Sequence, residues 1–416
     1  MSDPTRATAT TAATCRICEG EVTEFLDLGR QPLSDAFPEP ARTEGEFFYR
    51  LAVGVCADCS MVQLTEEVPR EKMFHEDYPY HSSGSSVMRE HFSATARGFI
   101  EKELTSADPF VVEIGCNDGI MLRTVSEAGV RHLGVEPSGG VAKVAAEAGI
   151  RVRNDFFEER TAAEIRAEDG PADVIYAANT LCHIPYMDSI LRGIGTLLGP
   201  DGVFVFEDPY LGDIVEKTSF DQIYDEHFYF FTARSVAAMA ARFGLELVDV
   251  RRLTVHGGEV RYTLALAGAR TPSPAVAELV AEETERGLGA LPTLKAFAAN
   301  VENIRTELVA LLGRLRAEGH SVAAYGATAK SATVTNFCGI GPELVGHVYD
   351  TTPAKQNRLS PGAHIPVVSA EEFSRDYPDY ALLFAWNHAE EIMRKEREFQ
   401  ENGGKWIFYV PTVHVV

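Results

Sequence analysis

The chain contains 416 residues, of which 45% are hydrophobic and 24% are charged, as is usual for a soluble globular protein. This length exceeds a single hydrophobic core and predicts two or three domains, and no apolar run reaches the roughly 18 residues that a membrane span requires. The formal net charge of −23 argues against nucleic acid as a partner, because phosphate binding requires a basic face. We therefore expect neither a membrane nor a nucleic-acid partner.

Two Cys-x-x-Cys pairs predict a zinc-binding domain over residues 14–75. The four residues are Cys15, Cys18, Cys56 and Cys59. Four thiolates complete a tetrahedral zinc site, and their spacing is typical of zinc ribbons with a strand-rich insert, here near residues 23–28 and 47–55. Because sulfur would fill every position, the metal would stabilise the domain without taking part in catalysis. The alternative is two unrelated pairs of reduced thiols.

Cysteine usage and the N-terminus indicate where the protein works. The seven cysteines are an odd number, and paired Cys-x-x-Cys motifs favour metal binding in a reducing compartment over disulfides. Residues 1–13 lack the basic and apolar signature of a secretion signal, so we expect a flexible tail. We therefore expect a cytoplasmic protein. Nothing in the sequence is typical of a coiled coil, and we expect a monomer.

A polar, aromatic and turn-rich segment, residues 77–86, lies between this domain and a helix predicted over residues 87–104. Its hydroxyl groups make it a candidate lid or substrate wall beside a cofactor domain. Within it, Tyr80 and Ser83 are the predicted substrate contacts. The alternative is an ordinary surface linker.

Residues 76–270 alternate between strands and helices, which predicts a doubly wound parallel sheet. The predicted strands cover residues 110–114, 132–135, 150–152, 173–177 and 202–207, and a hairpin of residues 245–253 and 259–266 closes the unit. In such sheets the ligand lies beyond the carboxyl ends of the strands. Site residues are therefore expected in the loops at that edge.

The first of these loops, Glu113-Ile-Gly-Cys-Asn-Asp-Gly119, is the centre of the predicted cofactor site. Gly115 and Gly119 would let the backbone approach a ligand, and Glu136, after the next strand, could accept both hydroxyls of a ribose. The loop lacks Gly-x-Gly-x-x-Gly, and Asp118 would repel a pyrophosphate. A neutral or cationic nucleoside therefore fits better than a dinucleotide. The alternative is an ordinary strand–turn–helix connection.

This loop resembles motif I of S-adenosylmethionine-dependent methyltransferases, with Asn117 in place of the middle glycine of the motif. Further contacts to that cofactor are predicted where the next strands end, at Pro137, Asn154, Asp155, Phe156 and Asn179. Asp155 could accept a hydrogen bond from the exocyclic amine of adenine, while Phe156 covers the ring.

Residues 224–231, Tyr-Asp-Glu-His-Phe-Tyr-Phe-Phe, combine acids, a histidine and aromatic side chains. They lack the period of a core strand and are predicted to form a site loop. A single histidine is more often structural than catalytic. His183 and His227 are stronger candidates because both lie in loops at the predicted ligand edge.

Residues 271–416 predict a helical linker and a second Rossmann-like unit. Helices over residues 274–285 and 292–318 precede strands at 321–325, 345–349, 380–384 and 405–409. The turn after the first strand contains Gly326 and Lys330 at the start of a helix, an arrangement that suits a phosphate group. Lys355 and Arg358 add positive charge after the next strand. The alternative for this turn is packing alone.

Together these motifs resemble the S-adenosylmethionine-dependent C-methyltransferases that act on nucleotide-linked deoxysugars in antibiotic biosynthesis, in particular the sugar 3-C-methyltransferases of the tetronitrose and kijanose pathways. The resemblance covers nearly the whole chain after residue 14. Besides the cysteine pairs and the 113–119 loop, it is carried by Pro-Leu-Ser-Asp-Ala-Phe (32–37), Gly-Val-Glu-Pro-Ser (134–138), Tyr-Asp-Glu-His-Phe-Tyr-Phe (224–230), Tyr-Gly-Ala-x-Ala-Lys (325–330), Asp-x-x-Pro-x-Lys-Gln-x-Arg (350–358), Pro-Gly-x-His-Ile-Pro (361–366) and Ala-Trp-Asn (385–387).

The resemblance implies a small zinc-binding N-terminal domain, a central cofactor domain and a C-terminal Rossmann-like domain, with substrate between the last two. It also implies methyl transfer to C3 of a TDP-linked 3-amino-4-keto-2,3,6-trideoxyhexose, with S-adenosylmethionine and zinc as the bound cofactors. Matched motif by motif, the active-site residues of the family fall on Tyr78, His183, Tyr224, Glu226 and His227.

Enolate chemistry is consistent with these residue types. Removing the proton beside a ketone requires a base poised near neutral pH, and histidine is the usual one. We predict His227 as the base, with Glu226 holding its ring or the substrate amine. Tyr224 and His183 would donate hydrogen bonds to the C4 oxyanion, and Tyr78 would share the base role or shape the lid. The alternatives are a sugar O- or N-methyltransferase, an NAD-linked nucleotide-sugar oxidoreductase, and a zinc-dependent scaffold without activity.

Overall fold

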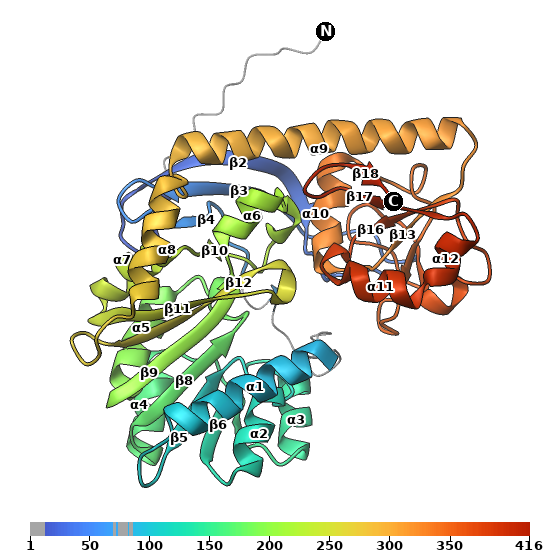
Figure 1. Ribbon diagram of the computed structural model, residues 1–416. Helices are drawn as coiled ribbons and strands as arrows, with labels where there is room; N and C mark the ends of the chain where they lie inside the picture. Colours follow the sequence, from blue (N-terminus) through green and yellow to red (C-terminus); the bar gives the residue numbers. More distant parts are fainter. Residues whose placement is uncertain (1–12, 70–71, 74–81, 83–85) are drawn as a thin grey trace.

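Three β-sheets organise the chain (Figure 1). The computed structural model describes residues 13–69, 72–73, 82 and 86–416. Among these residues no helix is both long and apolar enough to cross a membrane. The predicted fold class is confirmed: in chain order, a small N-terminal domain is followed by a central Rossmann-like domain and by a second Rossmann-like domain.

The N-terminal sheet is antiparallel, with the strand order β1-β2-β3-β4-β10. Its strands are Ala13–Thr14 (β1), Glu21–Pro32 (β2), Phe48–Cys56 (β3), Val62–Leu64 (β4) and Tyr229–Phe230 (β10). We call the part of the chain that forms β1 to β4 the zinc lobe. The edge strand β10 comes from much later in the chain.

The prediction that residues 224–231 contain no core strand is wrong for Tyr229 and Phe230. Both side chains are buried, and their backbones pair with Gln63 and Val62 of β4. A strand of two residues is too short to show a period. Its partner strand is also remote in the sequence, so no local pattern could reveal the pairing.

The central sheet has the order β11-β12-β9-β8-β5-β6-β7. Its strands are Phe110–Ile114 (β5), Arg131–Val135 (β6), Val152–Arg153 (β7), Ala172–Ala178 (β8), Leu198–Pro209 (β9), Leu245–Leu253 (β11) and Glu259–Leu266 (β12). Strands β5 to β9 are parallel, and the hairpin β11–β12 joins antiparallel to β9. The carboxyl ends of β5, β6 and β8 therefore meet at one edge, where a ligand is expected.

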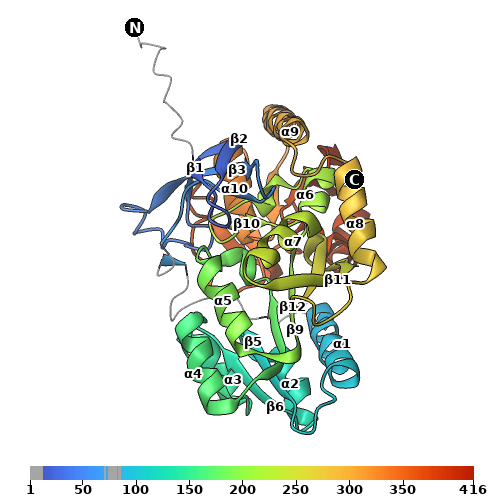
Figure 2. The same ribbon diagram turned by 90° about the vertical axis from the view of Figure 1, so that its left-hand side faces the viewer.

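Helices cover both faces of this sheet, as the views in Figures 1 and 2 show. They are Ser86–Lys102 (α1), Ile120–Glu127 (α2), Gly139–Glu147 (α3), Glu159–Asp169 (α4), Met187–Leu197 (α5) and Ala233–Arg242 (α7). A further helix, Leu211–Lys217 (α6), follows β9. Alternate residues of β5 divide between two cores: Val111 packs with α1 and α2, and Val112 packs with α4 and α5. This continuous apolar strand is typical of a parallel sheet buried on both faces.

The C-terminal sheet has the order β15-β14-β13-β16-β17-β18. Its strands are Val322–Tyr325 (β13), Val348–Asp350 (β14), Val367–Ser369 (β15), Tyr380–Leu383 (β16), Lys405–Phe408 (β17) and His414–Val415 (β18). The helices are Pro274–Glu285 (α8), Leu291–Ala317 (α9), Ala329–Cys338 (α10), Ala389–Lys395 (α11) and Arg397–Glu401 (α12). Only β18 runs antiparallel to its neighbour.

The helices α9 and α10 hold the C-terminal domain against the zinc lobe. Helix α9 buries one stripe, at Leu294, Val301, Leu308 and Leu315 among others, and contacts both β2 and β13. Helix α10 packs on β2 as well. Figure 1 shows α9 running across the top of the molecule from α8 to the C-terminal domain. The predicted helical linker therefore packs against both the N-terminal and the C-terminal sheet.

Candidate active site

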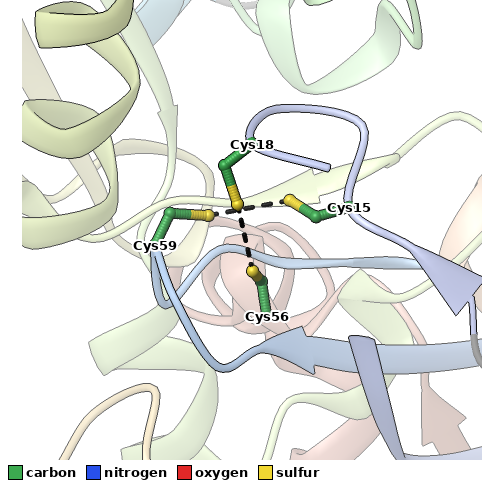
Figure 3. Close-up of side chains that lie close together, drawn as sticks. All are labelled: Cys15, Cys18, Cys56 and Cys59. Atoms are coloured by element: carbon green, nitrogen blue, oxygen red, sulfur yellow. Dashed lines mark hydrogen bonds between the residues drawn. The ribbon is translucent and has the colours of Figure 1, made fainter. Parts of the chain in front are cut away.

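The four paired cysteines converge on one point (Figure 3). Their sulfur atoms all lie within 4.8 Å of one another. The Sγ atoms of Cys15 and Cys59 are 3.6 Å apart, and those of Cys18 and Cys56 are 3.3 Å apart. Sulfurs bound tetrahedrally to zinc at about 2.3 Å lie roughly 3.8 Å apart, so the quartet fits zinc with little adjustment. The alternative of two unrelated thiol pairs does not agree with this convergence.

A second layer of donors orients the quartet. The Gln63 side-chain amide donates to the Cys15 sulfur over 3.1 Å, and the Ile17 backbone N–H donates to the same sulfur over 3.4 Å. Such outer contacts hold metal-ligating groups in place. With four sulfurs the site is coordinatively closed, so its role is structural.

The zinc lobe also borders the predicted catalytic segment. Beyond the β4–β10 pairing, the backbone N–H of Leu64 donates to the Phe228 carbonyl over 2.9 Å. The backbone N–H of Ser34, within the 32–37 motif, donates to the Asp225 carboxylate over 3.1 Å. The lobe therefore contacts this segment at both ends.

The cofactor loop after β5 requires left-handed backbone at three positions. Gly115, Asn117 and Gly119 have φ angles of 68°, 49° and 75°. Asparagine tolerates this region better than most residues, which explains why it can replace the middle glycine of the motif. A Cβ at Gly115 would lie 2.5 Å from the Thr180 hydroxyl, so a glycine here permits close packing between two loops. Its contact with a ligand remains a prediction.

Glu136 is held at the centre of this loop. Its buried carboxylate accepts hydrogen bonds from the backbone N–H of Asn117 over 2.9 Å and of Ser138 over 2.8 Å. Burial raises the pKa of this carboxyl group, and the two backbone donors oppose that rise. A carboxylate offers about four acceptor positions, so two remain for the hydroxyls of a ribose. The residues present therefore fit S-adenosylmethionine.

Replacing Glu136 by glutamine is expected to weaken the binding of S-adenosylmethionine roughly 10- to 100-fold, because hydrogen bonds to a charged acceptor are worth roughly 1.5–3 kcal/mol. Titration calorimetry measures the change. Glu147→Gln is the matched control, since Glu147 lies on α3 with its side chain 68% exposed. Unchanged affinity in Glu136→Gln would show that this carboxylate does not contact the cofactor.

Other predicted cofactor residues support the loop. Glu113 lies buried beneath it, and burial together with the nearby carboxylates of Glu136 and Asp118 raises the pKa of its carboxyl group. The Asn154 amide donates to the carbonyls of Glu136 and Pro137 over 2.7 and 3.0 Å, which joins the ends of β6 and β7. These contacts show how the loop is built, and contact with the cofactor remains a prediction.

Asp155 has protein partners for both carboxylate oxygens: the Phe156 backbone N–H at 2.9 Å and the Arg160 guanidinium at 3.0 Å. Its predicted bond to adenine would have to share these acceptors. Asn117 accepts from the Ser82 backbone N–H over 3.0 Å, which brings the end of the 77–86 segment to the cofactor loop. Asn179, at the end of β8, has a φ of 48° and donates its backbone N–H to Glu207.

The predicted catalytic residues His183, Tyr224, Glu226 and His227 come together beside this edge. His183 lies in the short 3₁₀ helix Leu181–His183 that follows β8. Its ring stacks on that of His227 with centroids 5.1 Å apart, and its Nδ1 lies 3.9 Å from a carboxylate oxygen of Glu226. Tyr78, Tyr80 and Ser83 lie outside the described residues.

His227 lies between two hydrogen-bonding partners. Its Nδ1 is 2.7 Å from the Gln222 carbonyl, and its Nε2 is 2.8 Å from the Tyr224 hydroxyl. A carbonyl can only accept, so Nδ1 carries the hydrogen and Nε2 accepts from the tyrosine. The structure therefore fixes one tautomer, with the basic nitrogen directed at Tyr224.

Burial keeps both histidines neutral. Desolvation lowers the pKa of His183 to about 4 and lowers the pKa of His227 well below its usual value. Nearby His183 lowers the pKa of His227 further. Burial and the neighbouring Glu226 raise the pKa of Tyr224 well above 10. The site therefore offers neutral imidazole and neutral phenol at physiological pH.

The sequence analysis missed three buried carboxyl groups around this site. Burial raises the pKa of Asp208 to about 7, of Asp225 to about 6, and of Glu259 well above its usual range. Asp208 and Glu259 lie on the paired strands β9 and β12, where Asp208 pairs with Val260, the residue next to Glu259. The sequence could have indicated Asp208 as a site residue, since an acid at the end of a buried strand is unusual.

The predicted phosphate-binding cations differ in their contacts. The Lys330 Nζ lies 5.2 Å from the ring centroid of Trp386. Burial lowers the pKa of Lys330, and the carboxyl groups of Asp221 and Glu259 oppose that lowering. Lys355 forms an ion pair with Asp35 of the zinc lobe at 2.8 Å, and Arg358 donates to the Phe37 carbonyl at 3.2 Å. Two of the three cations thus serve contacts between domains in this structure.

Comparisons with known protein families match three consecutive parts of the chain. The model of a proposed zinc-binding domain matches residues 15–74, and the model of a methyltransferase domain matches residues 88–250. The model of a C-methyltransferase C-terminal domain matches residues 254–411. The first match contains all four cysteines of the metal site.

Individual proteins are also similar to parts of this chain or to nearly all of it. An S-adenosylmethionine-dependent methyltransferase of known structure from Anabaena variabilis aligns with 42% of this chain and 84% of its own, at 20% identity and a TM-score of 0.34. The ubiquinone biosynthesis O-methyltransferase of Cupriavidus pinatubonensis is 31% identical over 40% of this chain and 72% of its own length. The C-methyltransferase NovU of Streptomyces niveus is 34% identical over 97% of this chain and 96% of its own length. The chain therefore belongs to the family of S-adenosylmethionine-dependent C-methyltransferases.

Proposed function

We propose that this enzyme methylates C3 of a TDP-linked 3-amino-4-keto-2,3,6-trideoxyhexose through an enolate, as a step in deoxysugar biosynthesis. The sugar is suggested by the ordered motifs of the sequence. The enolate is suggested by one observation above all, the hydrogen-bonded series Gln222–His227–Tyr224 in a buried site. A carbon beside a ketone becomes nucleophilic only after its proton is removed, and this series can remove it.

His227 is the base in this proposal, and Tyr224 relays the proton. The Tyr224 hydroxyl takes the proton of C3 while it gives its own to Nε2 of His227, to which it already donates. The Gln222 carbonyl then stabilises the imidazolium through Nδ1. The 2.8 Å bond thus gives Tyr224 a role besides the oxyanion contact expected from the sequence.

His183 and Glu226 act on the substrate around the reacting carbon. His183 stays neutral because its pKa is about 4, so it donates to the C4 oxyanion without surrendering its proton. Glu226, which lies beside His183, accepts from the 3-amino group. Tyr78 keeps the role that the resemblance assigns to it, sharing the base role or shaping the lid. Bound S-adenosylmethionine supplies an electrophilic methyl group, and these residues make C3 the nucleophile.

The nucleotide part of the substrate lies against the C-terminal domain in this proposal. Lys330 is the principal phosphate contact, because its ammonium group lies at the domain boundary beside Trp386. Lys355 and Arg358 are the further phosphate contacts in this proposal, and their bonds to Asp35 and Phe37 hold them beside the zinc lobe. Tyr80 and Ser83 are the remaining substrate contacts in this proposal.

Replacing Lys330 by methionine is expected to raise KM for the nucleotide sugar about tenfold with unchanged affinity for S-adenosylmethionine, because one charge-assisted contact to phosphate is lost. Steady-state kinetics and calorimetry measure the two quantities. Lys405→Met is the matched control, since Lys405 also lies over an aromatic ring, 5.7 Å from Tyr380, on the exposed side of the same domain. An equal rise in KM in both variants would show that Lys330 does not contact the substrate.

The substrate is tested with methyl-labelled S-adenosylmethionine and a panel of TDP-4-keto-deoxysugars, with and without a 3-amino group, in deuterated water. Transfer of label to C3 with loss of the C3–H signal is the expected result. Label on oxygen or nitrogen would contradict the enolate and the role of His227. Equal turnover of sugars that lack the amine would contradict the role of Glu226.

A further inference from the structure

A buried carboxylate, Asp221, joins the C-terminal domain to the segment that carries His227. Asp221 lies in the 3₁₀ helix Phe220–Gln222 and is 0% exposed. One of its oxygens accepts two hydrogen bonds of 2.6 Å, from the indole N–H of Trp386 and from the hydroxyl of Tyr409. Both donors belong to the C-terminal domain, and Trp386 belongs to the Ala-Trp-Asn motif (385–387), whose hydrogen bond to Asp221 has no part in the proposed function.

The residue after Asp221 is the one that holds the base. The Gln222 carbonyl accepts from Nδ1 of His227 over 2.7 Å, and the Gln222 side chain donates to the His256 carbonyl over 3.1 Å. The position of this carbonyl decides which nitrogen of His227 carries the hydrogen. A shift of the 3₁₀ helix would therefore change the tautomer or the tilt of the ring.

Further contacts from the C-terminal domain hold the same turn. The Thr333 hydroxyl of α10 donates to the Ile223 carbonyl over 2.8 Å, and the Phe220 ring packs on Phe337 with centroids 5.7 Å apart. The tip of the β11–β12 hairpin closes the other side. A Cβ at Gly257 would lie 2.8 Å from the Trp386 ring and 3.3 Å from the Gln222 amide.

We propose that Asp221, Trp386 and Tyr409 form a clamp through which the docked C-terminal domain positions His227. The clamp fixes the 3₁₀ helix, the helix places the Gln222 carbonyl, and the carbonyl keeps the hydrogen of His227 on Nδ1 so that Nε2 stays basic. Asp221 is a positioning residue, since it acts on His227 through the Gln222 carbonyl. The consequence for turnover rests on the proposed role of His227 as the base.

The test uses Tyr409→Phe, Trp386→Phe and Asp221→Asn in the full chain. Each variant is expected to lower kcat about tenfold with little change in KM for S-adenosylmethionine, because a small displacement of a catalytic group is costly. Tyr325→Phe is the matched control. Tyr325 is a buried tyrosine of the same domain whose hydroxyl donates to the Glu396 carboxylate over 2.8 Å, far from the 3₁₀ helix in the sequence and without contact to it.

The tautomer of His227 is read directly from two-bond proton–nitrogen spectra of histidine-labelled protein, with the signals assigned by their loss in His227→Asn. Wild type and Tyr325→Phe should show the Nδ1–H form, and Tyr409→Phe should show a mixture of both tautomers. If Tyr409→Phe keeps the wild-type kcat and the wild-type tautomer of His227, the proposed clamp is wrong. If His227→Asn stays active, the proposed base fails instead, and the spectra still decide whether the clamp exists.

Discussion

Replacing His227 by asparagine is expected to lower kcat about 10²- to 10⁴-fold, the usual contribution of a general base. The asparagine amide can still donate to the Gln222 carbonyl, which accepts from Nδ1 of His227 over 2.7 Å in the wild type, so the segment should remain folded. It cannot take the proton from Tyr224. Steady-state methyl transfer measures the loss of kcat, and exchange of the sugar C3 proton in deuterated water measures enolate formation separately.

Three further measurements test whether the loss of kcat reflects loss of the base. Affinity for S-adenosylmethionine should be nearly unchanged, because Glu136 and its loop lie on other strands. His320→Asn is the matched control, since the side chain of His320 is 40% exposed on the C-terminal domain. In the wild type the acid limb of the kcat profile should lie well below pH 6.5, because burial lowers the pKa of His227. A His227→Asn variant that still exchanges the C3 proton at the normal rate would contradict the base assignment.

The strands of the central sheet could be predicted from the sequence because burial on both faces makes them continuous apolar runs. The predicted strand at residues 110–114 has the same bounds as β5, and the hairpin strands β11 and β12 were also predicted with their observed bounds. The predicted strand at 202–207 is longer in the structure, where β9 reaches Pro209. This extension places Asp208 inside the sheet, which is why its burial was missed.

The features that sequence analysis missed depend on residues far apart in the chain. Lys355 and Arg358 have the composition and position of phosphate contacts, yet Lys355 pairs with Asp35, which lies 320 residues earlier. The burial of Glu259 depends on how the hairpin meets the C-terminal domain. Local period and composition carry no information about such docking. His183 and His227 could be predicted as site residues because both lie in loops at the carboxyl edge of the sheet, and that edge follows from topology. Tyr224 and Glu226 were assigned only through the resemblance to the family.

Loss of zinc from the zinc lobe is expected to have the second large effect on methyl transfer. Exchange of Cys56 for serine, or removal of zinc by a strong chelator, is expected to abolish nearly all methyl transfer although the metal is coordinatively closed. Structural zinc contributes about 10–16 kcal/mol of binding energy to the fold of its site. Loss of that energy would unfold the strand β4, whose Gln63 and Val62 pair with Tyr229 and Phe230 of the catalytic segment.

The pattern of losses distinguishes this coupling from general unfolding. Calorimetry should find affinity for S-adenosylmethionine largely retained, because the cofactor loop is built on β5 and β6, which do not pair with the lobe. Cys338→Ser is the matched control, since Cys338 is a buried cysteine of α10 outside the quartet.

Mass spectrometry of the metal content should show zinc lost only from the chelated protein and Cys56→Ser, and added zinc should restore activity to the chelated wild type. A zinc-free enzyme with full kcat would mean that residues 224–227 keep their geometry without β4. The observed contacts argue against this, because the lobe holds that segment both at Asp225, through Ser34, and at β10.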